Sequence, residues 1–175
     1  MNIRKATVKD LNGIVSIYDE IHEREENGET TTGWIKKIYP VRKTAEESIA
    51  RRDMFVQEDA SGTITATGII NQSQVDVYKL GRWRYPASDP EIMVLHTLVV
   101  SVRPGHRGSG REFLSFYEEY ARQNGCKYLR LDTNARNEAA RTFYQKRGYR
   151  EIGIVPTVFN GIPGVNLVLL EKALV

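Results

Sequence analysis

Cysteine is nearly absent from this sequence. Cys126 is the single cysteine among 175 residues, so no disulfide can form within the chain. Such sparse use of cysteine is typical of proteins kept in a reducing compartment. We expect Cys126 to be a buried structural thiol and not a nucleophile.

Long hydrophobic runs are missing too. The chain has no continuous stretch of about 18 apolar residues, which a membrane-spanning helix would need. It also does not open with the basic residues and apolar core of a secretory signal. These absences predict a cytoplasmic protein with no membrane partner.

Neither sign of charge dominates the composition. Lys and Arg number 25 against 22 Asp and Glu, which gives a formal charge of +3 and a pI near 9.0. The cations are spread along the chain and do not gather in one block, so no nucleic-acid partner is expected. A nucleic-acid-associated protein is the weakest alternative, because the mildly basic balance alone supports it.

Several ligand-binding signatures are also absent. The chain contains neither G-x-G-x-x-G nor G-x-x-x-x-G-K-[ST], which argues against dinucleotide and P-loop sites. Its histidines, cysteine and carboxylates are not spaced as metal ligands, so no metal is expected.

Strand and helix patterns alternate along the second half of the chain. The composition, 41% hydrophobic and 27% charged, is that of a globular protein, and the length fits one domain over residues 1–175. Apolar periodicity predicts a short strand at the opening of the chain and strands near 54–59, 63–71, 91–102, 127–133, 149–156 and 165–174. It predicts helices after Asp10, from 44 to about 51, from 109 to about 123 and over 137–147. The pattern indicates an α/β (α+β) fold in which helices flank a mixed central sheet.

A glycine-rich stretch, "VSVRPGHRGSGREF" at 100–113, joins a predicted strand to a predicted helix. Free backbone N–H groups at a helix start favour a bound anion, and glycine lets the backbone approach it closely. This feature alone is weak, because many strand-to-helix turns are rich in glycine for geometric reasons only.

A second motif supports a ligand-binding role for this loop. The stretch "NEAARTFYQKRGY" at 137–149 matches the pattern N-x-x-A-x-x-[FL]-Y-x-K-x-G-[FY], and it follows the next strand. Together the two motifs resemble the Gcn5-related N-acetyltransferase (GNAT) family. The resemblance, which extends to the opening "IRKATVKDLNGIVSIY", implies the family's mostly antiparallel sheet and the use of acetyl-CoA.

The family's loop pattern, [QR]-x-x-G-x-[GA], fits here in two registers. One register begins at Arg107 and puts Glu112 at the final small position. The other begins at Gly105 and puts Gly108 and Gly110 at the two glycine positions of the pattern. The family has apolar residues three and four places after the last glycine, which the second register supplies as Phe113 and Leu114. The resemblance therefore implies a pyrophosphate loop formed by Gly105, His106, Arg107, Gly108, Ser109 and Gly110, with Gly105 replacing the usual Gln or Arg.

Further cofactor contacts follow from the same resemblance. The backbone of Leu98, Val99 and Val100 should splay from the neighbouring strand and pair with the pantetheine arm. Asn137 should hydrogen-bond the cofactor, and Tyr144 should protonate the departing thiolate. Asn137 and Tyr144 lie seven residues apart, so they share a helix face. Arg141 is expected either at a cofactor phosphate or on a solvated surface.

Acetyl transfer to an amine also needs a base, because the neutral amine attacks. His96 is the first candidate, since some family members place a catalytic histidine on this strand; a structural, hydrogen-bonded histidine is the alternative. Glu91 or Asp132 acting through water comes next. His22, in the charged stretch "IHEREENGE", is expected on a solvated face.

The acceptor is the least determined feature. Two loop-like stretches carry the aromatics Trp34, Tyr39, Trp83 and Tyr85, which either line an acceptor pocket or simply pack the loops. We expect a small-molecule amine or amino-acid-like acceptor. The resemblance also implies a homodimer. The main alternative function is a non-catalytic acyl-CoA-binding or regulatory module on the same fold.

Overall fold

A seven-stranded sheet forms the centre of the protein. The computed structural model describes residues 2–103 and 105–174. The sheet order is β1-β2-β3-β4-β5-β7-β6, and within the described residues β4 and β5 form the parallel pair while the other pairs are antiparallel. This confirms the predicted mixed, mostly antiparallel sheet. The strands are β1 (Asn2–Lys5), β2 (Met54–Glu58), β3 (Ile64–Asn71), β4 (Ile92–Val100), β5 (Tyr128–Asn134), β6 (Arg150–Phe159) and β7 (Ile162–Ala173).

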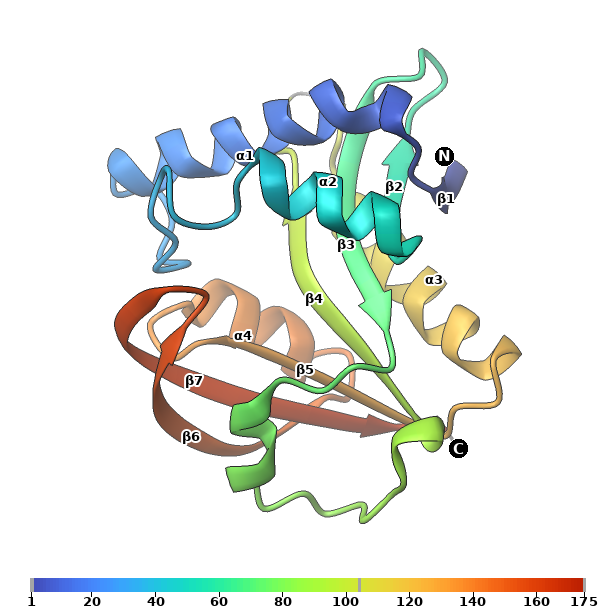
Figure 1. Ribbon diagram of the computed structural model, residues 1–175, viewed down its shortest axis with the longest axis vertical. Coiled ribbons are helices and arrows are strands. Elements are labelled where there is room, and N and C mark those ends of the chain that lie inside the picture. The colour runs from blue at the N-terminus through green and yellow to red at the C-terminus, as the bar shows by residue number, and fades with distance from the viewer. Residues whose placement is uncertain (1, 104, 175) are drawn as a thin grey trace.

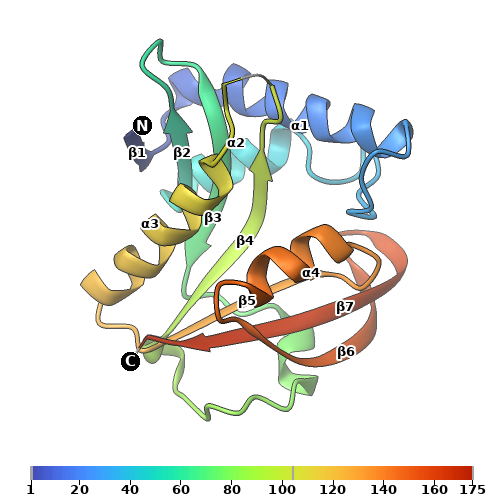
Figure 2. The same cartoon turned by 180° about the vertical axis from the view of Figure 1, so that it is seen from behind.

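Helices cover both faces of the sheet. The α-helices are α1 (Leu11–Glu26), α2 (Arg42–Arg51), α3 (Ser109–Gln123) and α4 (Glu138–Gln145), and the short 3-10 turns are η1 (Val8–Asp10), η2 (Asp76–Leu80) and η3 (Asp89–Glu91). Figure 1 shows α1 and α2 in front of the sheet, and Figure 2 shows α3 and α4 on the opposite face. No helix in the described part of the chain has the length and apolar character to cross a membrane.

Strands β4 and β5 separate about halfway along their length. They pair only from Ile92 with Tyr128 to Leu95 with Leu131, after which β4 continues beside β3 and β5 continues beside β7. In Figure 1 the two strands start together near the C-terminus and then diverge. A bulge on β4 accompanies the split: the β3–β4 register shifts between Thr67 and Ile69, and Thr97 has a φ of 49°. The split leaves one edge of β4 without a strand partner.

The core confirms the expected inner face of α3. Phe113, Leu114 and Tyr117 are almost completely buried. The Tyr117 hydroxyl donates to the carbonyl oxygens of Met93 and Arg130, at 2.7 and 3.2 Å, and so bridges β4 and β5 on the side where they remain paired. This packing fixes the start of α3 against the diverging strands.

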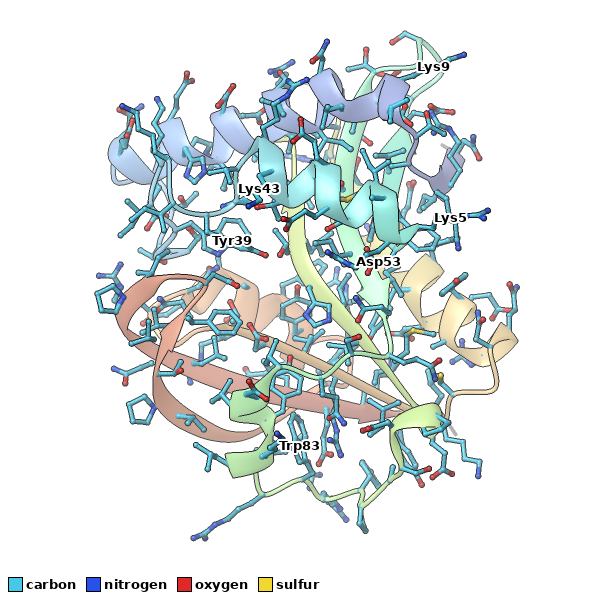
Figure 3. The ribbon with its side chains drawn as sticks, in the orientation of Figure 1. Lys5, Lys9, Tyr39, Lys43, Asp53 and Trp83 are labelled. Atoms are coloured by element: carbon cyan, nitrogen blue, oxygen red, sulfur yellow. The ribbon has the colours of Figure 1, made fainter. Side chains whose placement is uncertain are left out.

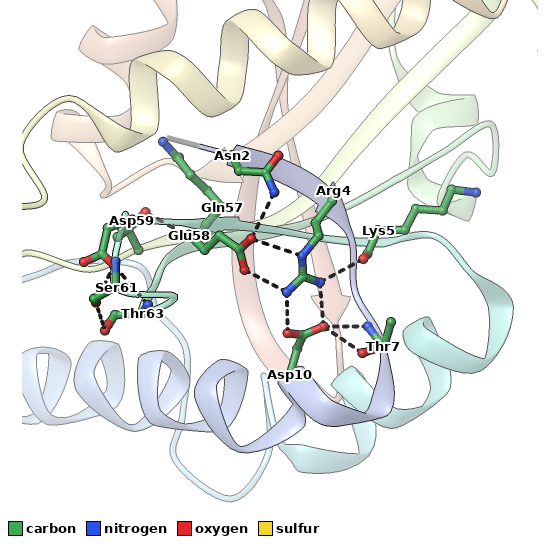
Figure 4. A network of polar contacts seen from close by, with 11 residues as sticks. Asn2, Arg4, Lys5, Thr7, Asp10, Gln57, Glu58, Asp59, Ser61 and Thr63 are labelled. Carbon is green, nitrogen blue, oxygen red and sulfur yellow. Dashed lines mark hydrogen bonds and ion pairs between the residues drawn. The ribbon is translucent and has the colours of Figure 1, made fainter.

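A polar network ties the N-terminal strand to its neighbours (Figure 4). The Arg4 guanidinium contacts Asp10, at the start of α1, and Glu58, at the end of β2, both at 2.8 Å. The hydrogen bond from Arg4 lowers the pKa of Asp10 to about 2. A charge-assisted network of this kind holds the edge strand β1 and the start of α1 in place beside β2.

Candidate active site

The split between β4 and β5 opens into a cleft of about 730 Å³. Its walls come from β4, β5, α4, the start of α3, the loop that follows α1 and the turn between β6 and β7. Of the residues predicted from the sequence, those that line the cleft are His96, Leu98, Val99, Val100, Gly108, Gly110, Asn137 and Tyr144, together with Trp34, Tyr39 and Asp132.

Tyr144 contributes a hydroxyl in its protonated form. Its side chain is buried against Phe143 and Tyr149, with ring centroids at 5.2 and 5.7 Å. Burial raises the pKa of Tyr144, and the nearby charge of Asp132 raises it further. The hydroxyl is therefore protonated at neutral pH and available as a hydrogen-bond or proton donor.

Asn137 is the N-cap of α4. Its side-chain Oδ1 accepts a hydrogen bond from the backbone N–H of Ala140 at 3.2 Å, which starts the helix. Asn137 and Tyr144 both line the cleft. The cap bond therefore holds the Asn137 side chain against the start of α4.

The glycine loop begins α3 at the edge of the cleft. Gly108 is the N-cap of α3 with a φ of 97°, and Gly105 has a φ of 90°; such conformations favour glycine. Gly108, Gly110 and Arg111 line the cleft. A glycine-bounded helix start beside a cation is chemically suited to a pyrophosphate.

The other four residues of the predicted loop, Gly105, His106, Arg107 and Ser109, do not line the cleft. The His106 ring is buried, with Nδ1 at 3.0 Å from the Ser101 hydroxyl and Nε2 at 3.7 Å from an Asp59 carboxylate oxygen. Ser109 is completely buried, and Arg107 is exposed. The His106 side chain therefore does not face the cleft, because Ser101 and Asp59 of the β2–β3 turn lie against its ring.

Arg141 also has a structural role and does not line the cleft. Its guanidinium forms a bidentate pair with Glu151 on β6, at 2.7 and 2.9 Å, and donates to the Ala135 carbonyl at 2.9 Å. The cations on the cleft wall are instead Arg24, Arg111 and Arg147. Arg147 belongs to the recognised motif, but the motif pattern specifies no residue at its position.

His96 stands at the point where the strands diverge. Its Nε2 lies 3.0 Å from the Asn71 side-chain oxygen, which also accepts the Ser73 N–H at 2.9 Å. Because the Asn71 amide nitrogen donates to Asp53, the oxygen faces His96 and Nε2 is the protonated ring nitrogen. Burial lowers the pKa of His96 to about 4, so the ring is neutral at pH 7.

Asp132 is the first residue of β5 beyond its pairing with β4. Its Oδ2 accepts a hydrogen bond from the Tyr78 hydroxyl at 2.7 Å. Burial raises the pKa of Asp132 to about 6, although the Tyr78 bond opposes the rise. The other carboxylate candidate, Glu91, lies outside the cleft and pairs with Lys127 at 2.9 Å, which lowers its pKa to about 2.

The loop after α1 covers one side of the cleft. The Glu25 carboxylate receives the Thr30 hydroxyl, the Thr32 N–H and hydroxyl, and the Gly33 N–H, at 2.7 to 2.9 Å. A β-carbon on Gly33 would meet the Asn134 amide at 2.3 Å, so the loop passes close to β5. Its aromatics Trp34 and Tyr39 line the cleft.

The second aromatic stretch is directed away from the cleft. Trp83 donates its Nε1–H to the Tyr78 carbonyl at 2.7 Å, and Tyr85 stacks on Tyr128 at 5.2 Å. Figure 3 shows Trp83 beside η2, whereas Tyr39 lies on the loop between α1 and α2. Of the two alternatives left open for Trp83 and Tyr85, the structure shows loop packing, and neither residue lines the cleft.

Two remaining predictions concern His22 and Cys126. His22 is buried, with Nε2 at 2.8 Å from the Pro40 carbonyl oxygen, because the loop after α1 folds back over it; the expected solvated face is wrong. Cys126 is a buried free thiol, as predicted. Among residues 2–103 and 105–174, no three histidine, cysteine or carboxylate side chains are grouped as metal ligands would be.

Comparison with known proteins identifies the family. The family profile described as "Acetyltransferase (GNAT) family" matches residues 14–149. YhfO, an uncharacterized N-acetyltransferase of Bacillus subtilis (strain 168), is 27% identical over 155 residues, which cover 86% of this chain and 91% of that protein.

Solved structures share the fold. A GNAT-family acetyltransferase of Streptococcus agalactiae aligns with a TM-score of 0.80 and 21% identity, covering 98% of this chain and 94% of that one. The protein yncA of Salmonella typhimurium, solved with its cofactor acetyl-CoA, aligns with a TM-score of 0.68 and 17% identity, covering 100% and 94%. The chain therefore belongs to the acetyltransferase (GNAT) family, whose members use acetyl-CoA, and it is an acetyltransferase.

Proposed function

We propose that the protein transfers an acetyl group from acetyl-CoA directly to a primary amine. The acceptor is a small-molecule amine or an amino-acid-like compound. The observation that carries this proposal is the cleft at the β4–β5 split, where Tyr144 and Asp132 meet the aromatic loop that follows α1. A proton donor, a proton acceptor and an apolar wall are the groups that amide formation needs.

The donor half of the cleft fits acetyl-CoA. The β4 edge at Leu98–Val100 has no strand partner on the β5 side, so its backbone is available to pair with a pantetheine arm. The glycine-bounded start of α3 would hold the pyrophosphate through the amides of Gly108 and Gly110, which line the cleft, and Arg111 would add charge. When bound, acetyl-CoA supplies an activated thioester carbonyl.

Two residues then handle the protons of the transfer. Asp132 accepts a proton from the acceptor ammonium, which leaves the nitrogen lone pair free to form the C–N bond. As the C–S bond breaks, Tyr144 donates its phenolic proton to the departing sulfur. After attack the nitrogen is cationic and loses a second proton, which passes to solvent as the intermediate collapses. The products are the acetamide, the free thiol of CoA and one proton released to solvent. The proton held by Asp132 then passes through solvent to Tyr144, which restores both residues for the next turnover.

Asp132 is the favoured base because its pKa of about 6 lies close to neutral pH. A base is most effective when it is ionised at the working pH yet still has appreciable proton affinity. His96, with a pKa of about 4, is neutral but a weaker proton acceptor. Its role as base stays a prediction with its own test.

Trp34, Tyr39 and Phe159 would line the acceptor side, and Asp132 lines the same cleft. A carboxylate at the end of an aromatic wall suits an ammonium group attached to an apolar body. The predicted homodimer and the predicted cytoplasmic location both stay predictions.

Release of CoA thiol across a panel of primary amines and amino acids tests the proposed function. We expect acetyl-CoA-dependent thiol release with some primary amines, and none with the same compounds after N-acetylation. Tight binding of acetyl-CoA without turnover across a broad panel would contradict the proposal and support a non-catalytic binding module.

A further inference from the structure

We propose that Tyr78 is a positioning residue of this enzyme: its hydroxyl orients the Asp132 carboxylate and sets the strength of that base. This inference rests on the proposed function, because it takes Asp132 to be the group that accepts the acceptor's proton. Nothing in the recognised motifs points to Tyr78, which lies in the segment between β3 and β4.

The contact itself is short and shielded from water. The Tyr78 hydroxyl donates to Asp132 Oδ2 at 2.7 Å, and the Tyr78 side chain is only 2% exposed. A hydrogen bond to a carboxylate in such surroundings is stronger than one in water. Because the bond holds Oδ2 of Asp132, it restricts rotation of the carboxylate.

Tyr78 is itself held by Trp83. The Trp83 Nε1–H donates to the Tyr78 carbonyl at 2.7 Å, and the two rings pack with centroids at 5.3 Å. Trp83 also contacts Arg130, whose guanidinium carbon lies 4.0 Å from the centroid of the Trp83 ring. The tyrosine therefore sits in a rigid aromatic and cationic stack against β5.

Two buried charges anchor the rest of the segment. Glu171 on β7 accepts the Arg84 N–H at 2.8 Å, and Arg130, its register partner on β5, donates to the Tyr85 carbonyl at 3.2 Å. Both charged side chains are at least 95% buried. Removing one partner of such an arrangement is costly, so the segment has little freedom to withdraw Tyr78.

Other titratable groups also surround Asp132. Tyr144 faces it from α4, Tyr39 from the loop after α1, and His96 lines the same cleft from β4. Arg130 lies two residues away on β5. The tyrosines are protonated and His96 is neutral near pH 7, because burial raises the pKa values of the tyrosines and lowers that of His96.

The direction of the Tyr78 effect follows from these surroundings. Burial raises the pKa of Asp132, whereas the hydrogen bond from Tyr78 stabilises the carboxylate and lowers it. Loss of the hydroxyl should therefore make Asp132 protonate at higher pH. The base would then be partly protonated, and so inactive, near neutral pH.

The test is the pH dependence of kcat in Tyr78→Phe, measured with one acceptor so that the acceptor's own titration is common to every profile. We expect the acid limb of the profile, where kcat falls at low pH, to move up by about one pH unit. The free energy of a hydrogen bond to a charged group corresponds to a pKa change of about that size. At pH values above the limb, kcat should recover to within about tenfold of the wild-type value. An acid limb that stays in place overturns the inference.

Tyr117→Phe is the matched control. It removes an equally buried hydroxyl, one that bonds to the carbonyls of Met93 and Arg130 and not to Asp132, so its acid limb should stay at the wild-type position. A limb that moves equally in both variants would also overturn the inference, because it would report general loosening of the core.

A second variant covers poor folding of Tyr78→Phe. Trp83→Phe removes the Nε1–H donor to Tyr78 but keeps an aromatic ring beside Arg130, so a smaller upward shift of the limb is expected; an unmoved limb there would count against the inference.

Asp132→Asn separates the two proposals. If it keeps the wild-type rate, Asp132 is not the base and this inference falls with it, while CoA release by the wild type would still support acetyl transfer.

Discussion

The hydroxyl of Tyr39 is hydrogen-bonded to the hydroxyl of Thr97, and this bond joins the loop after α1 to the bulge of β4. Thr97 is β-branched and has a φ of 49°, a conformation that costs about 1–3 kcal/mol outside glycine. The loop proposed to form the acceptor side is thus attached to the strand proposed to bind the donor.

Replacement of Tyr39 by Phe should separate acceptor binding from donor binding. The variant keeps the ring at the cleft wall and loses only the bond to Thr97. We expect kcat/KM for the acceptor to fall about tenfold, the equivalent of one hydrogen bond, while the KM for acetyl-CoA changes little. Steady-state kinetics with each substrate varied in turn measure both. Tyr85→Phe, outside the cleft, is the control; equal effects of the two variants would refute the coupling.

Glu25 organises the loop and gives a second test. Burial would raise the pKa of Glu25, but the hydrogen bonds from Thr30, Gly33 and Thr32 outweigh it and lower the pKa. Glu25→Gln puts an N–H₂ group against these donors, so we expect a higher acceptor KM and a loss of about 2 kcal/mol in stability. Thermal unfolding and steady-state kinetics check both effects.

Glu23→Gln is the matched control for that test. Glu23 lies on the exposed side of α1, two residues before Glu25, and should tolerate the change. If Glu25→Gln behaves like Glu23→Gln, the loop does not depend on the carboxylate.

The pH profile distinguishes the two candidate bases. A base must be unprotonated to act, so with Asp132 as base kcat should fall as the pH drops through about 6. With His96 as base, activity should persist down to about pH 4. We expect the limb near pH 6, still present in His96→Ala and lost with most activity in Asp132→Asn. A limb that vanishes only in His96→Ala would instead assign the base to His96.

Asp132 should also lower the stability of the enzyme at neutral pH. Its folded pKa of about 6 lies above the ordinary value of 3.8, so its contribution to stability is fully present below about pH 4 and is lost as the pH rises through 6. Asp132→Asn does not titrate and should be about 2 kcal/mol more stable at pH 7.5, with a Tm higher by roughly 5 °C. Thermal melts at pH 4 and pH 7.5 check this; a gain that is the same at both pH values would contradict the assigned cause.

Residue spacing predicted the elements well because spacing determines which face of a helix is buried. Phe113 and Leu114 lie on the inner face of α3, and Asn137 and Tyr144 line the cleft together, as their spacing indicates. The split of β4 from β5 was expected only from the family resemblance, since the apolar pattern of β4 is the same before and after Leu95.

Long polar side chains were predicted poorly because their partners come from distant parts of the chain. Arg141 pairs with Glu151 on the following strand, and His106 with Asp59 of the β2–β3 turn. Tyr78 reaches Asp132 across 54 residues of sequence. No local period or motif records such contacts, which depend on how the strands are ordered in the sheet.

The most direct test of the central claim, acetyl transfer at the β4–β5 split with Tyr144 as the acid, is the rate of CoA release by Tyr144→Phe at saturating acetyl-CoA and acceptor. Tyr149→Phe, a buried neighbour whose hydroxyl bonds to Glu118, serves as the control. We predict that Tyr144→Phe lowers kcat by about 10²-fold or more while its affinity for acetyl-CoA stays within a few-fold of the wild type, because the ring remains and only the proton donor is lost. A Tyr144→Phe enzyme with the kcat of the wild type would contradict the account.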